Sequence, residues 1–197
     1  MRFIDRPFGV AAAVFLLGSL VGAFLVLVLP PIRGPIMGLL QGRLIAPIRT
    51  VSQFGNGAIL LLVFVNNSIP ASLSFAYPFI IAKTHWTPPL TPEKRRALLS
   101  YYTWLCAFFL GFFGLGVALS ISWLIGGKPF LFALLKGALI HGPIELTAVV
   151  LCVSEPLRLA GRGRGDLFVH LRQDLGLLLI CLSALLGAAA IEVFAGI

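Results

Sequence analysis

Five long apolar stretches dominate the pattern of hydrophobic and polar positions along this chain. They cover residues 8–29, 57–82, 101–125, 129–153 and 175–197. Each is long enough to cross a hydrocarbon core about 30 Å thick, which takes about 20 helical residues. Hydrocarbon offers no hydrogen-bond partner to backbone groups, so a helix must satisfy them within the stretch itself. The pattern predicts an all-α fold, a single transmembrane domain over residues 1–197 with about five membrane-spanning helices.

The segment between the first two stretches is apolar in a periodic way. Ile36, Leu40, Leu44, Ile48 and Val51 recur at spacings of three and four residues. This spacing favours a short helix that lies in the membrane interface. The alternative is an external loop with apolar anchors, because glycines and prolines interrupt the segment.

The segment before the third stretch contains residues that are typical of the start of a helix. Thr91 can accept a hydrogen bond as the N-cap, Pro92 suits the first helical position, and Glu93 places an acid in the first turn. We therefore expect a helix that begins near Thr91 and runs into the third span.

Composition excludes a water-soluble domain and points to the bilayer as the main partner. Apolar residues make up 59% of the chain and charged residues 11%, and the mean hydropathy is +1.02. One core of a chain this short cannot bury so much apolar surface from water. The 15 Lys and Arg residues against 7 Asp and Glu flank the apolar stretches, a pattern of membrane topology that argues against nucleic acid. The three cysteines lie within apolar stretches and are expected to be free thiols.

The distribution of basic residues predicts an orientation in the cell membrane. Most Lys and Arg residues outside the spans fall on the side that holds Arg2 and Arg6, so we expect a cytoplasmic N-terminus and an external C-terminus. Arg158, Arg162 and Arg164 follow the fourth span on the cytoplasmic side. They are expected to mark the topology or to contact anionic lipid headgroups.

The second span contains polar groups where lipid would surround it. Asn66 and Asn67 precede Pro70, which cannot donate a hydrogen bond and crowds the preceding turn. A kink or break is expected at Pro70. The two carboxamides either hydrogen-bond within the bundle or line a site at a discontinuous helix.

The fourth span carries the most unusual residues of the chain. His141 and Glu145 are four residues apart and share a helix face, while Gly142 and Pro143 favour local unwinding between them. Glu145 either bonds His141 or the two asparagines as a structural lock, or titrates in a substrate or proton path. A metal site is the third interpretation, although this pair supplies only two ligands. Glu192 in the last span is expected near the external surface, in contact with solvent.

The fourth segment resembles the stage II sporulation protein M family. The resemblance rests on the HGxxE motif formed by His141, Gly142 and Glu145, on the Leu157-Arg158-Leu159 sequence after the apolar run, and on the Asn66-Asn67 pair. It covers about residues 54–161. It implies a multi-pass membrane protein that is not itself an enzyme, because the family's namesake is a membrane scaffold for peptidoglycan hydrolases during engulfment.

The leading hypothesis is therefore a non-enzymatic membrane protein that assembles with itself or with another membrane protein. His141, Glu145, Asn66 and Asn67 are expected to form a polar junction between the second and fourth spans. A small transporter or channel with a path past Glu145 is the alternative, and an intramembrane metalloenzyme is the third. No catalytic residue, cofactor or metal ligand is assigned, and the substrate is left open.

Overall fold

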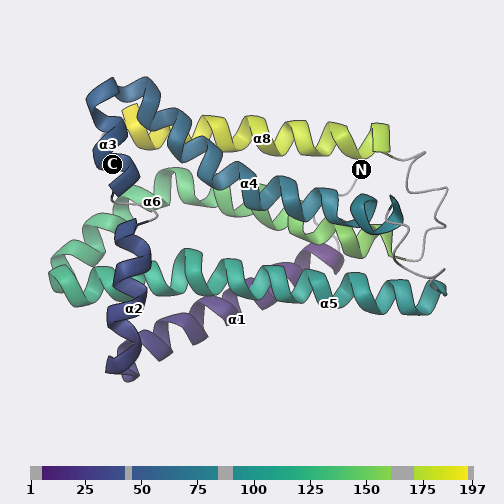
Figure 1. The fold of residues 1–197 in the computed structure, drawn as a ribbon, viewed down its shortest axis with the longest axis horizontal. Coiled ribbons are helices and arrows are strands. Elements are labelled where there is room, and N and C mark those ends of the chain that lie inside the picture. Colours follow the sequence, from purple (N-terminus) through teal and green to yellow (C-terminus); the bar gives the residue numbers. More distant parts are fainter. Residues whose placement is uncertain (1–5, 43–45, 84–90, 161–170, 195–197) are drawn as a thin grey trace.

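The chain folds into a bundle of long helices. The computed structural model describes residues 6–42, 46–83, 91–160 and 171–194, and these residues contain no strand. The elements, in chain order, are α1 (Arg6–Val28), α2 (Pro30–Leu40), α3 (Ala46–Val51), η2 (Ser52–Phe54), α4 (Asn56–Lys83), α5 (Pro92–Leu110), the π-helical segment η3 (Gly111–Val117), α6 (Ala118–Leu159) and α8 (Leu171–Phe194). The predicted all-α fold class is confirmed (Figure 1).

Five segments of the described chain are long and apolar enough to cross a membrane, as in a multi-pass membrane protein. They are Arg6–Val28, Asn56–Pro78, Pro92–Pro129, Leu139–Leu159 and Asp174–Phe194. This agrees with the number of spans predicted from the sequence. The helix of the fourth span continues to Leu159, beyond the predicted end at residue 153.

A glycine interrupts the helical backbone between the third and fourth spans. Within α6, Gly127 has φ 62° and ψ −157°, a conformation that residues with a Cβ rarely adopt. Helical geometry continues through Gly142 and Pro143, and α4 continues through Pro70. The break or unwinding expected at these three residues therefore does not occur. The chain reverses direction at Gly127, between the third and fourth spans (Figure 1).

The described residues of the predicted interfacial segment form α2, α3 and the 3-10 helix η2, and α2 runs crosswise to α5 near one end of the molecule (Figure 1). Ile32, Ile36 and Met37 pack against a buried cluster that contains Val26 of α1. The Arg33 side chain donates hydrogen bonds to the Val26 and Leu27 carbonyls, at 2.9 and 2.6 Å. These bonds satisfy carbonyls at the C-terminal end of α1, where a cation is also favoured by the helix dipole.

The predicted start of the helix that runs into the third span is confirmed. Pro92 is the first residue of α5, and the Thr91 hydroxyl accepts a hydrogen bond of 3.3 Å from the Lys94 backbone N–H. From this cap the chain is helical through α5, η3 and the first part of α6. The helix therefore begins at Pro92, before the apolar stretch that starts at residue 101.

Glycines bring α1 into backbone contact with the end of α5 and with η3. A Cβ added at Gly18 or Gly22 would collide with the backbone of Phe108 or Phe112, and one added at Gly111 or Gly116 would collide with the backbone of α1. Small residues at such crossings let membrane helices approach closely. The Ser120 hydroxyl lies on the same contact and reaches the Ala23 carbonyl at 3.2 Å.

A buried apolar cluster joins the remaining helices. Ala71 of α4, Ala148 and Cys152 of α6, and Cys181 and Leu185 of α8 belong to it. The described thiols of Cys106, Cys152 and Cys181 are free, as expected. This cluster holds α4, α6 and α8 together and so fixes the relative position of the polar side chains that these three helices carry.

Glycine substitution tests the close contact of α1 with the C-terminal part of α5, where Gly18 lies against Phe108. Gly9 and Gly18 lie on the same helix, and nothing is within 4 Å of a Cβ added at Gly9. We expect Gly18→Ala to lower the free energy of unfolding by about 1 to 3 kcal/mol, as overpacked cores do. Gly9→Ala serves as the matched control and should leave stability unchanged or higher. Thermal unfolding of both variants in detergent measures the difference, and equal stability would contradict the packing.

Candidate functional site

A hydrogen bond between two spans forms the centre of the candidate site. Nδ2 of Asn67 on α4 donates to Oε1 of Glu145 on α6, at 2.5 Å, and both side chains are half-buried. The predicted polar junction between the second and fourth spans therefore exists for this pair. In hydrocarbon a carboxyl group must find a partner within the protein, and the carboxamide supplies it.

His141 meets a different acid from the one its spacing suggests. Its Nε2 lies 3.9 Å from Oε2 of Glu192 on α8, the distance of an ion pair when the imidazole is protonated. No hydrogen bond joins His141 to Glu145 in the described part of the chain. Nδ1 of His141 is buried without a hydrogen-bond partner there. The side chain of Glu192 is 33% exposed, so it retains an exposed part and also faces His141 in the bundle.

Asn66 does not join the junction. It is exposed on the outer face of α4, whereas Asn67 turns inward. Consecutive helical residues project about 100° apart, so a pair of asparagines cannot both face the same neighbour. Of the four residues predicted to form one polar cluster, the structure brings together Asn67, Glu145 and His141.

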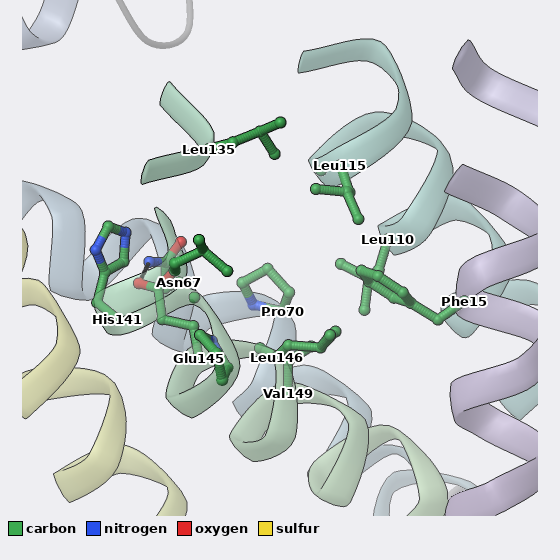
Figure 2. Close-up of a pocket in the computed structure, with 14 residues that line it drawn as sticks. Phe15, Asn67, Pro70, Leu110, Leu115, Leu135, His141, Glu145, Leu146 and Val149 are labelled. Atoms are coloured by element: carbon green, nitrogen blue, oxygen red, sulfur yellow. Dashed lines mark hydrogen bonds between the residues drawn. The ribbon is translucent and has the colours of Figure 1, made fainter. Parts of the chain in front are cut away.

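These three side chains line one side of a cavity of about 410 Å³. In Figure 2, Asn67, His141 and Glu145 lie on one side of it, and Phe15, Leu110 and Leu115 lie on the other. Leu135, Leu146 and Val149 add further apolar wall. The cavity thus lies among α1, α4, α5, η3 and α6, and it combines a hydrocarbon lining with one polar corner.

A second polar cluster lies near the C-terminal end of α6. Glu155 is 1% exposed, and Arg158 donates to its carboxylate at 3.0 Å. Asp174, in the first turn of α8, is also buried. The Arg158 side chain is 12% exposed, so the expectation that it contacts lipid headgroups is corrected: its guanidinium satisfies a buried acid. Arg162 and Arg164 lie outside the described residues.

The site offers hydrogen bonding and charge more readily than metal binding. Across the described ranges, no group of three or more His, Cys, Asp or Glu side chains is placed to hold a metal ion. His141 and Glu145 point to different partners instead of converging on a shared point. The carboxylate of Glu145 can accept hydrogen bonds from a ligand. The imidazole of His141 can donate or accept a hydrogen bond, depending on its protonation.

Several residues of the site carry no signal in the sequence. Phe15 and Leu110 are apolar residues in apolar spans, and only the packing of distant helices places them opposite Glu145. Glu192 was recognised as an acid in the last span, a type of residue that marks functional positions in membrane proteins, but its contact with His141 was not predicted. The sequence contains only a weak indication that Glu155 is buried. That indication is Arg158, a possible ion-pair partner three residues later on the same helix face.

Comparisons with protein-family models, with characterised proteins and with solved structures found no significant match to this chain.

Proposed function

We propose that this chain is a non-enzymatic membrane protein that assembles with itself or with another membrane protein in the cell membrane. In this proposal the Asn67–Glu145 hydrogen bond holds α4 on α6, and the outer face of α4 contacts the partner. The N-terminus is placed in the cytoplasm and the C-terminus outside, in accord with the distribution of basic residues.

The observation that carries the proposal is the exposure of Asn66. Its carboxamide lies on the outer face of a span, and no side-chain hydrogen bond joins it to the part of the chain that the structure describes. Ile69 and Leu73, which are three and seven residues further along the same helix face, are 53% and 57% exposed. A polar side chain at such a position stabilises contacts between membrane helices by hydrogen-bonding across them.

The resemblance of His141, Gly142 and Glu145 to the HGxxE motif of the stage II sporulation protein M family supports the same class of function. A scaffold role needs a rigid bundle and a surface for partners. The close backbone contact between α1 and η3 provides rigidity, and the exposed face of α4 provides such a surface.

Photo-crosslinking in membranes tests the assembly. A photoreactive phenylalanine analogue in place of Ile69 should capture a neighbouring protein, either a second copy or another membrane protein. We expect Asn66→Leu to lower the crosslinking yield by about threefold to twentyfold, because one hydrogen bond between membrane helices is lost.

The matched control places the same analogue at Leu20 of α1, which is 70% exposed and lies on a different helix. This position should give a low yield that Asn66→Leu does not change. Equal capture from both positions, or capture at position 69 that is insensitive to Asn66→Leu, would contradict the proposal.

Transport past Glu145 is the second candidate, and the cavity beside that carboxyl favours it. Ion or small-solute flux into liposomes that contain the purified protein should then fall several-fold in Glu145→Gln. The Asn66→Leu variant, which changes the outer face of α4, should retain the flux. If wild type, Glu145→Gln and protein-free liposomes leak equally, the transport candidate is removed.

A further inference from the structure

The cavity among α1, α4, α5, η3 and α6 has the dimensions of a ligand site within a single chain. Its volume of about 410 Å³ falls in the range of small-molecule sites, which is roughly 300 to 1,000 Å³. Such sites combine a mostly apolar lining with a few polar groups that orient the ligand. The cavity has this character, because its polar groups gather at one corner.

The charges around that corner favour a cation. Glu145 lines the cavity, and the carboxylate of Glu192, which is not among the lining residues, lies 3.9 Å from Nε2 of His141. Neither Lys nor Arg occurs among the described lining residues. Asn67 binds one oxygen of Glu145, and Oε2 makes no hydrogen bond to the described residues. An acidic group in such surroundings is stabilised by a positively charged partner that brings its own hydrogen-bond donors.

His141 is a second polar residue at the same corner of the cavity. His141 is 9% exposed, lines the cavity, and has a buried Nδ1 without a partner in the described chain. Buried polar atoms of folded proteins almost always have a partner. The side chain of His141 lines the same corner of the cavity, so a ligand head that bonds the free oxygen of Glu145 also lies beside this imidazole.

The opposite wall specifies the rest of the ligand. Phe15, Leu110 and Leu115 face the polar corner across the cavity (Figure 2). Leu146 and Val149 continue the apolar surface along α6. A hydrocarbon tail is the group that gains most from contact with this wall, since burial of each methylene contributes about 0.8 kcal/mol.

We propose that the cavity binds an amphipathic amine, with its ammonium group at Glu145 and His141 and its hydrocarbon tail against Phe15, Leu110 and Leu115. The proposal concerns the interior of one chain. It is therefore independent of assembly through the outer face of α4, and either proposal can fail without the other.

Photolabelling of the purified full-length chain in lipid nanodiscs tests the proposal. The probe is an alkylamine with a diazirine at the far end of its chain, and labelled residues are mapped by mass spectrometry. We expect label on α1 and η3, at or next to Phe15 and Leu115. Octylamine should compete with this label, whereas octanol, which has the same tail without the charge, should compete about tenfold less well.

Two variants separate the ammonium site from general lipid contact. Glu145→Gln keeps an acceptor for Asn67 and should abolish the preference for octylamine over octanol. Gly114→Leu places a side chain in the cavity, and nothing lies within 4 Å of a Cβ added there. It should remove the label while Glu145 is intact. Gly187→Leu on α8 is the matched control, because its added Cβ also meets nothing within 4 Å and Gly187 does not line the cavity.

Three results would overturn the proposal. Equal competition by octylamine and octanol in the wild type would show a hydrocarbon site without charge recognition, such as a site for a lipid acyl chain. Label that persists in Gly114→Leu would place the probe outside the cavity. Loss of label in Gly187→Leu to the same extent as in Gly114→Leu would show that the label reports a general change of the bundle.

Discussion

The packing of this bundle depends on a hydrogen bond to a carboxyl group that lies in a membrane span. Lipid cannot supply that bond, so another helix of the protein must. Glu145 lies in a span, and Asn67 from another span donates a hydrogen bond to it. This bond stabilises the packing of α4 on α6, because separation of the helices would leave both groups without a partner. The apolar cluster that contains Ala71 and Cys152 supports the same contact, and the cavity forms beside it.

Much of the fold could be predicted from the sequence, because hydrophobicity and helix signals act locally. The length of each apolar stretch predicted the spans, and Thr91 with Pro92 predicted the start of α5. The prolines inside the spans did not produce the helix breaks that were expected from them. Helix α4 continues through Pro70, whereas the backbone leaves the helical conformation at Gly127, where the chain must reverse between two spans.

The candidate site was predictable only where a polar residue stands out against an apolar span. Asn67 and Glu145 were found in this way, but the choice of Asn67 over Asn66 depends on the direction from which α6 approaches α4. The partner of His141 comes from α8, which is distant in sequence. The close contact of Gly18 and Gly22 with Phe108 and Phe112 was not predicted, because it depends on which helix packs against α1.

The coupling energy between Asn67 and Glu145 tests the central claim most directly. It is measured by a double-mutant cycle with Asn67→Ala, Glu145→Ala and the double variant, from reversible unfolding in bicelles. The account predicts a favourable coupling of about 0.5 to 1.5 kcal/mol, the range found for hydrogen bonds between membrane helices. Additivity of the two single substitutions to within about 0.3 kcal/mol would contradict it.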